Sequence, residues 1–254
     1  VQSGTALAPM LLASLGTGRP TAVYLHNVET HQLHGALRPD PSILFLANSD
    51  FTARRWRALF GLDCAVIPPV VDGERYYTPT TGDQVLFVNP APIKGVELMF
   101  ALAAQCPELP FLVVESWNLE PTWRRHCRWR ALQLGNVEWQ EPTDDMRGLY
   151  ARSRMLLMPS VWEESFGRTV VEAQLNGLPV LASNRGALVD NVGEGGLTLD
   201  PHAPVEDWAD ALRRVYVDGE GWGDAARRKG LAHAASTPVI AGDLLSLLAA
   251  HAQR

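Results

Sequence analysis

The 254-residue sequence has few cysteines, no excess of positive charge and no long apolar run. Its three cysteines are widely spaced, which excludes a paired disulfide framework and close-spaced zinc ligands. A net charge of −6 disfavours nucleic acid as a partner. No window approaches the roughly 20 apolar residues that a membrane-spanning helix needs, and no basic-then-apolar leader opens the chain. We therefore expect a cytoplasmic protein without a transmembrane segment.

Residues 85–199 alternate regularly between short apolar runs and segments with helical spacing. The apolar, β-branched runs predict strands at 85–88, 111–115, 136–138, 155–158, 179–182 and 197–199. The segments between them predict helices at 94–105, 121–133, 144–151 and 167–176, with a short turn near 187–191. This α/β alternation predicts a parallel sheet covered on both faces, and hence a complete Rossmann-like domain over residues 79–236.

The first 78 residues show the same alternation but fewer strands. Strands are predicted at 21–26, 42–47 and 64–67, and helices at 5–15 and 51–60. So small a sheet cannot bury both faces by itself. Together with a first residue other than Met, this indicates a partial N-terminal domain, followed by a proline-marked linker at 68–79. Helices are predicted at 205–217, 223–235 and 239–251, and we treat 237–254 as a separate C-terminal helix.

The stretch from residue 158 to residue 182 contains the most informative residues. A predicted strand ends at Met158, a polar loop carries Glu164, and Gly167 opens a helix that contains Glu172. Ligands bind parallel sheets at such loops, and the N-terminus of a helix suits a phosphate. Glu172 lies about 7.5 Å along the helix axis from its start. One glutamate could therefore bind a sugar and the other a ribose, on either side of a diphosphate.

These residues resemble glycosyltransferase family 4, the glycosyl transferases group 1, which are retaining enzymes of the GT-B fold. The resemblance rests on two glutamates eight positions apart, Glu164 and Glu172, and on three other motifs in the family's order. These are the strand and turn that lead to Lys94 at 85–95, the last N-domain strand and linker at 47–49 and 66–72, and the strand that ends at His26.

The resemblance implies an α/β protein of GT-B type, with two Rossmann-like parallel-sheet domains of which the N-terminal one is incomplete. It implies transfer of a sugar, such as a hexose, from a nucleotide-diphosphate sugar to an acceptor hydroxyl with retention, and no metal or other cofactor. Glu164, His26 and Lys94 are the expected catalytic residues. The expected donor-binding residues are Asn89, Lys94, Glu164, Ser165, Phe166, Gly167, Arg168, Thr169 and Glu172. The resemblance also implies that the helices after about residue 235 cross back to the first domain.

This sequence departs from the family at two places. Asn89 stands where the family usually has a phosphate-binding arginine, so Arg168 or another residue must compensate or the donor is bound differently. The family's first N-domain strand and glycine-rich loop are also missing. We therefore expect this chain to bind the donor but to transfer sugar poorly, unless an N-terminal segment or a second copy complements it. The acceptor, whether glycan, lipid or small molecule, is not specified.

Two other functions stay open: a donor-binding or degenerate module that needs another chain, and another enzyme of this fold such as a sugar-nucleotide epimerase or a phosphorylase. Other clusters have simpler interpretations. His26, Glu29, His31 and His34 match no standard zinc spacing, and without the resemblance His26 would be read as a core histidine. We interpret Asp144-Asp145 as a helix cap, and the arginines and tryptophans of 121–133 as a solvated face rather than a membrane or nucleic-acid surface.

Overall fold

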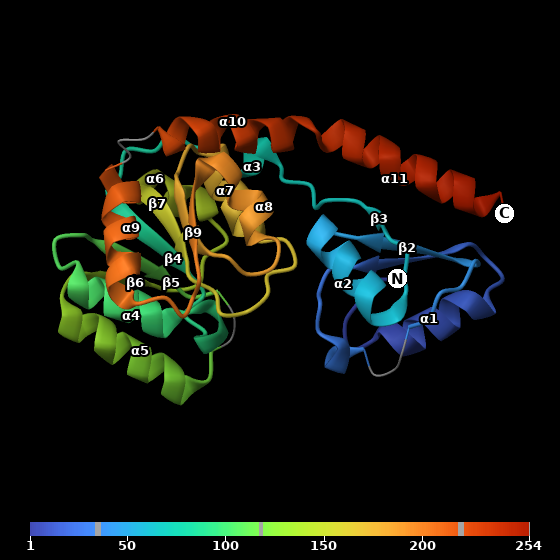
Figure 1. The fold of residues 1–254 in the computed structure, drawn as a ribbon, viewed down its shortest axis with the longest axis horizontal. Helices are drawn as coiled ribbons and strands as arrows, with labels where there is room; N and C mark the ends of the chain where they lie inside the picture. The colour runs from blue at the N-terminus through green and yellow to red at the C-terminus, as the bar shows by residue number, and fades with distance from the viewer. Residues whose placement is uncertain (34–36, 117–118, 218–220, 254) are drawn as a thin grey trace. The chain divides into compact units, whose positions relative to one another are not determined.

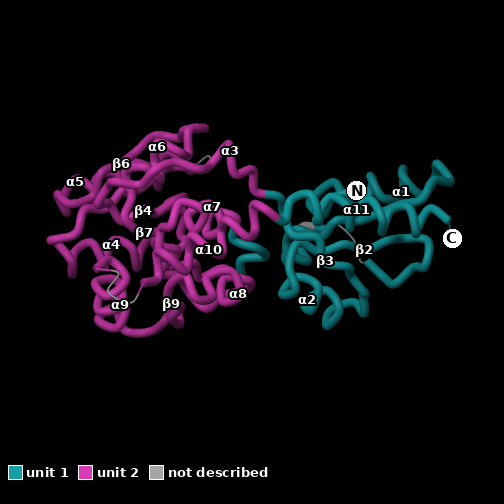
Figure 2. Tube along the Cα trace, turned by 90° about the horizontal axis from the view of Figure 1, so that it is seen from above, with its two compact units in different colours: residues 1–70, 163–167, 236–254 teal, residues 71–162, 168–235 magenta. Residues whose placement is uncertain are grey.

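The computed structural model describes residues 1–33, 37–116, 119–217 and 221–253. Contacts divide the chain into two compact units (Figure 2). The first unit comprises Val1–Val70, Glu163–Gly167 and Ser236–Arg254, and the second comprises Val71–Trp162 and Arg168–Ala235. This division differs from the predicted boundaries at residues 71–78, which group with the second unit, and at Glu163–Gly167, which groups with the first.

The second unit contains a six-stranded parallel sheet in the order β6-β5-β4-β7-β8-β9 (Figure 1). All six strands lie within a residue or two of their predicted positions, because most are short apolar runs bounded by turn residues. Their bounds are β4 Gln84–Val88, β5 Phe111–Val114, β6 Val137–Gln140, β7 Ser153–Met158, β8 Val180–Ser183 and β9 Gly196–Leu199. The Rossmann-like architecture predicted for this part of the chain is confirmed.

Helices cover both faces of this sheet. One face packs against α4 (Val96–Gln105), α5 (Pro121–Leu134) and α9 (Val205–Val217), and Val85 and Phe87 of β4 point into that core. The other face carries α6 (Met146–Arg152), α7 (Arg168–Leu175), α8 (Leu188–Val192) and α10 (Trp222–Ala235). Two short 3-10 turns, η2 (Pro92–Lys94) and η3 (Gly193–Gly195), complete the unit. Helices α7 and α10 pack closely, since a Cβ on Gly230 would lie 2.1 Å from the backbone nitrogen of Leu175.

The segment that was predicted as the end of a linker is docked onto the second unit. It contains α3 (Gly73–Tyr76), whose N-terminus is capped by Asp72. The side chain of Asn176, after α7, donates a hydrogen bond to the carbonyl of Tyr76 and accepts one from the backbone N–H of Thr78 at 2.7 Å. Because Asn176 is fully buried, these bonds hold the segment firmly against α7.

The first unit is built on a three-stranded parallel sheet in the order β1-β2-β3 (Thr21–Leu25, Ile43–Ala47 and Ala65–Val66). Helix α2 (Asp50–Phe60) packs on β2 and β3, α1 (Leu7–Gly16) packs on β1, and η1 (Thr30–Gln32) follows β1. Between them lies a core that includes Leu7, Val23 and Trp56. Trp56 is fully buried, and its indole N–H donates to the carbonyl of Asn27 at 3.0 Å.

The opposite face of the small sheet is covered by α11 (Thr237–Ala252). Ile240 packs against Leu46 and Ile67, and His251 Nε2 lies 3.0 Å from the carbonyl oxygen of Ser42. The three strands therefore do not bury both faces by themselves, as expected, but a helix from the end of the same chain supplies the second layer. Among the described residues, no single helix is both long and apolar enough to cross a membrane; α10 and α11 reach that length only when joined across the break between them.

Candidate functional site

The turn that carries Lys94 is fixed by backbone contacts inside the second unit. It runs from the end of β4 through η2 to Gly95, which has φ +80°. A Cβ on Gly95 would lie 2.0 Å from the carbonyl oxygen of Pro159, so only glycine fits this close approach. The carbonyl of Ile93 also accepts hydrogen bonds from the backbone N–H groups of residues 161 and 162. Lys94 is therefore held beside the loop that follows β7.

Asn89, directly after β4, has an unusual backbone conformation. Its φ is +71°, which makes it the one described residue other than glycine in the left-handed region. The side chain is buried, and among the described residues its Oδ1 atom has no hydrogen-bond partner. Strained backbone and unsatisfied buried polar atoms cluster at functional sites, because the surrounding structure must hold them in place. Both features therefore support a ligand-binding role for Asn89.

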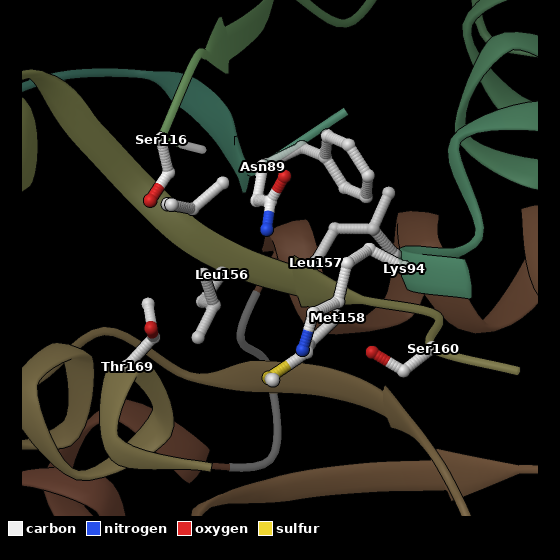
Figure 3. A pocket seen from close by; sticks show the side chains of 10 residues that line it. Asn89, Lys94, Ser116, Leu156, Leu157, Met158, Ser160 and Thr169 are labelled. Carbon is white, nitrogen blue, oxygen red and sulfur yellow. The ribbon is translucent and has the colours of Figure 1, made fainter. Parts of the chain in front are cut away.

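Asn89 and Lys94 line a cavity of about 130 Å³ at the carboxyl ends of the central strands (Figure 3). Three hydroxyl side chains share this cavity: Ser116 after β5, Ser160 after β7 and Thr169 in the first turn of α7. The first turn of α7 contains no acidic residue, so the positive end of its dipole is not offset there by a carboxylate. One ammonium group, several hydroxyls and a helix N-terminus form a site suited to a phosphate group.

A second cavity of about 310 Å³ shares Val88 and Ser116 with the first. It is lined by Glu115, Thr143 and Asp144, among others. Glu115 is fully buried and its Oε1 lies 2.6 Å from Nε of Arg124, while its Oε2 accepts a hydrogen bond from the indole N–H of Trp139. The two neighbouring cavities together offer more space than a phosphate occupies, with polar groups in both.

Glu172 is a buried carboxylate with a partner on each oxygen. Its Oε2 accepts a hydrogen bond from the hydroxyl of Tyr150 at 2.8 Å, and its Oε1 pairs with Nε of Arg168 at 2.7 Å. Burial raises the pKa of Glu172, although Tyr150 and Arg168 act in the opposite direction. Burial and the adjacent Glu172 charge raise the pKa of Tyr150 well above its usual value. Each carboxylate oxygen can accept a second hydrogen bond, so Glu172 can still receive a hydroxyl.

Arg168 was expected as a candidate to replace the missing phosphate-binding arginine. The structure instead pairs it with Glu172 and places its guanidinium over the ring of Tyr76, 5.3 Å from the centroid. Its Nη2 atom donates to the hydroxyl of Tyr76 at 3.0 Å. Arg168 does not line the cavity around Lys94. Its side chain therefore supports Glu172 in this conformation. Besides Lys94, the polar residues that line the cavity are uncharged: Asn89, Ser116, Ser160 and Thr169.

The remaining predicted residues, His26 and 164–167, belong to the first unit. His26 follows β1 and is exposed, so the core-histidine interpretation is wrong. Glu164 and Phe166 are buried. The hydroxyl of Ser165 donates to the carbonyl of His26 at 2.7 Å. The structure thus brings Asn89, Lys94 and Thr169 together around one cavity, and Arg168 and Glu172 together beside it.

Sequence reasoning missed Ser116, Ser160 and Tyr150. Ser116 follows the predicted strand 111–115 directly and Ser160 follows the predicted strand 155–158 by two residues, and that position alone could have identified them. Tyr150 lies in α6, and nothing local indicates that its hydroxyl reaches Glu172.

Several competing interpretations are resolved by contacts. The solvated-face interpretation of α5 fits Arg128 and Arg130, whose pairs with Glu141 and Glu97 are partly exposed, but not Arg124, which pairs with the buried Glu115. Asp145 caps α6 by accepting from the N–H of Gly148, as predicted. Within 1–33, 37–116, 119–217 and 221–253, no group of three or more potential metal ligands gathers, and His34 lies outside these residues.

The family profile described as glycosyl transferases group 1 matches residues 85–218, which is more than half of the chain. The chain belongs to this family. A D-inositol 3-phosphate glycosyltransferase of Corynebacterium jeikeium is 40% identical over 82 residues, covering 31% of this chain and 19% of the relative. The O-antigen chain mannosyltransferase B of Escherichia coli is 33% identical over 118 residues, covering 44% of this chain and 30% of the relative. These matches therefore span under a third of each relative's length.

Solved structures of other proteins share the fold. HepE of Anabaena, crystallised with UDP, superimposes with a TM-score of 0.80 at 21% identity, covering 96% of this chain and 76% of that one. A glycosyltransferase from Rickettsia africae gives a TM-score of 0.75 at 15% identity, covering 97% and 81%. At such identities the likeness shows the fold alone. Together with the two parallel sheets, it confirms that this member of the group 1 family has the predicted GT-B fold class.

Proposed function

We propose that this chain transfers a sugar from a nucleoside-diphosphate sugar to an acceptor hydroxyl, with retention at the anomeric carbon. The observation that carries the proposal is the cavity in which Lys94, Asn89, two serines and the first turn of α7 surround one space. Family membership supports the reaction class, and the retention is inferred from the resemblance. HepE, which has this fold, was crystallised with UDP-glucose, so a donor of that chemistry is a reasonable first substrate to test.

In this proposal the donor's diphosphate lies against Lys94 and the N-terminus of α7. The positive charge and the N–H groups stabilise the negative charge that develops on the leaving phosphate, so no divalent metal is required. Glu172 accepts hydrogen bonds from the ribose hydroxyls, supported by Tyr150 and Arg168. Glu164 and His26 are assigned to the sugar. The leaving phosphate itself would help to remove the proton from the acceptor hydroxyl as the new glycosidic bond forms.

Calorimetry with UDP and GDP, each measured with and without EDTA, tests the donor site. We expect at least one nucleoside diphosphate to bind, with the same affinity in the chelator. Lys94→Ala should weaken this binding about tenfold or more, because a charge-assisted contact contributes roughly 1.5–3 kcal/mol. The chain's other lysine provides the control: Lys229 is held by the carbonyl of Asp190, outside the cavity, so Lys229→Ala should retain the affinity.

A turnover assay then separates transfer from the alternatives. Incubation with a nucleotide sugar and an acceptor should release free nucleoside diphosphate, slowly in this chain and faster when the expected N-terminal segment is present. An epimerase does not release it, and a phosphorylase would require added inorganic phosphate. Binding that disappears in EDTA would contradict the metal-free site. Binding without nucleoside diphosphate release, across a panel of acceptors, would instead favour a donor-binding module.

A further inference from the structure

The short loop Glu163–Gly167, which we call the 163–167 loop, belongs by its contacts to the first unit although the sequence on both sides belongs to the second. One residue of the loop, Ser165, makes several hydrogen bonds to other residues of the first unit. Its backbone carbonyl accepts hydrogen bonds from the hydroxyls of Ser49 and Thr52, the latter at 3.1 Å. Two hydroxyl donors at the start of α2 therefore converge on one carbonyl oxygen.

The side chain of Ser165 makes a second set of bonds. Its hydroxyl donates to the carbonyl of His26 at 2.7 Å and accepts from Nδ2 of Asn48 at 3.1 Å. Asn48 also donates to the carbonyl of His26, at 3.2 Å. Asn48 is buried, so its two bonds are partly shielded from water, whereas the bond from the Ser165 hydroxyl to His26 is exposed. Ser165 thus joins the ends of β1 and β2 and the start of α2.

The partners of Ser165 are themselves held in place by the local fold. Ser49 is the N-cap of α2, where its hydroxyl accepts from the backbone N–H of Thr52 at 3.1 Å and donates to the Ser165 carbonyl. Asn48 directly follows β2. An ion pair between Arg55 and Glu163 at 3.5 Å adds a further contact, but both side chains are more than a third exposed, so it is weak. The hydrogen bonds of Ser165 are the stronger restraint.

We propose that Ser165 is a positioning residue: it locks the 163–167 loop onto the first unit and thereby sets the orientation of Glu164. Glu164 is the adjacent residue and is buried, so a shift of the Ser165 backbone would also move the backbone that carries Glu164. This inference rests on the proposed function, which assigns Glu164 to the donor sugar. Catalysis needs the reacting groups held in register, and small misplacements lower the rate strongly. The diphosphate and ribose contacts, in contrast, belong to residues of the second unit.

The test uses two variants that remove hydroxyls without enlarging any side chain. Ser165→Ala removes the bonds to His26 and Asn48, and Thr52→Val replaces the buried hydroxyl by a methyl group of similar size. Ser14→Ala is the matched control, because it removes a partly buried hydroxyl of the first unit that bonds Thr21 at 2.9 Å, away from the loop. Hydrogen–deuterium exchange of the 163–167 loop and steady-state kinetics are measured for all three.

We expect exchange in the 163–167 loop to rise about tenfold in Ser165→Ala, less in Thr52→Val, and not at all in Ser14→Ala. The kcat for transfer should fall about tenfold in Ser165→Ala, while affinity for the free nucleoside diphosphate changes less than about twofold, because the ribose and phosphate contacts are intact. A general loss of folding would instead lower both the affinity for nucleoside diphosphate and the protection of α7 from exchange. A fall in kcat with an unchanged affinity is therefore specific to positioning.

Unchanged exchange in the loop would overturn the proposal, as would increased exchange with an unchanged kcat. The proposed function fails in a different way, by absence of nucleoside diphosphate binding or release in the wild-type chain. In either case the exchange data still decide whether Ser165 holds the loop. If nucleoside diphosphate binds but is not released on turnover, the affinity for intact nucleotide sugar relative to nucleoside diphosphate replaces kcat as the readout for Glu164.

Discussion

The two parallel sheets of this chain are buried by different means. The six-stranded sheet of the second unit is covered on both faces by helices that alternate with its strands along the sequence. The three-stranded sheet of the first unit receives α1 and α2 on one face from neighbouring sequence, but its other face is covered by α11 from the end of the chain. A small sheet needs such an added layer, since three short strands bury little apolar surface on their own.

The same contrast applies to the functional residues. In the second unit, Asn89, Ser116 and Ser160 follow adjacent strands of one sheet, so the topology alone collects them at one edge. In the first unit, the 163–167 loop is held by side-chain hydrogen bonds to residues more than a hundred positions away in sequence. Sheet topology positions one group of residues, and a few specific hydrogen bonds position the other. The predictions below test this difference.

The largest expected effect is on a glycine that allows two helices of the second unit to pack. Gly230→Ala should lower the free energy of unfolding by about 3 kcal/mol, because the added Cβ would lie 2.1 Å from a backbone atom of Leu175, which cannot move aside easily. Gly242 in α11 of the first unit has open space around its Cβ position. Gly242→Ala should instead stabilise by up to about 1 kcal/mol through helix propensity. Chemical denaturation measures both, and equal effects would show that α7 and α10 are not in close contact.

The two glutamates allow the two units to be tested separately in binding experiments, because Glu164 belongs to the first unit and Glu172 to the second. Glu172→Ala should weaken nucleoside diphosphate and nucleotide sugar alike, since both contain the ribose. Glu164→Ala should weaken only the nucleotide sugar. Each loss is on the order of 1.5–3 kcal/mol, about tenfold or more in affinity. Calorimetry with both ligands measures the effects, and a similar loss for both ligands in both variants would refute the assignment of roles.

The pH dependence of stability provides a smaller test, limited to the second unit. Burial raises the pKa of Glu172 above its unfolded-state value. The folded protein therefore favours the neutral form of Glu172. The contribution of Glu172 to the free energy of unfolding is fully present below its pKa in the unfolded chain and is lost as the pH rises through its pKa in the folded protein. Glu172→Gln removes this loss, so the variant should gain stability relative to the wild type between about pH 4 and about pH 7. Denaturation at both pH values measures the difference, which should be absent if Glu172 is not desolvated in solution.

The smallest effect is expected for the ion pair of the 163–167 loop. Arg55→Ala should cost less than about 1 kcal/mol, because the side chains of Arg55 and Glu163 are 44% and 38% exposed and solvent screens their attraction. Loop exchange should change much less than in Ser165→Ala. High salt should have an equally small effect on the wild type. A rise in loop exchange as large as that in Ser165→Ala would mean that charge, rather than the hydrogen bonds of Ser165, fastens the loop.

Much of the secondary structure could be predicted because its causes are local. The run that forms β4 is apolar after Gln84, and Gly177 ends the helix that Gly167 opens, with φ of +72° and +81° at the two glycines. The order Met158, Glu164, Gly167, Glu172 was enough to predict the strand, loop and helix of the motif, and Lys94 could be linked to it by resemblance. These features depend on residues within a few positions of one another.

The partners of those residues could not be predicted in this way. That Arg168 pairs with Glu172 is allowed by helical spacing, but its stacking on Tyr76 and the bond from Tyr150 to Glu172 depend on how α3 and α6 pack around α7. The left-handed backbone of Asn89 likewise has no marker in the sequence, since asparagine adopts several conformations.

The sequence by itself determined the strands, the helices and the polar positions that follow the strands, because apolar periodicity, glycine and proline act over short distances. The family resemblance implied that the last helices return to the first domain, but only the tertiary structure decided which residues of α11 cover the first sheet and that Ser165 attaches the 163–167 loop to Asn48, Ser49 and Thr52. Those contacts join segments separated by more than a hundred residues. They form because packing brings a few buried polar atoms into hydrogen-bonding geometry, which no local pattern encodes.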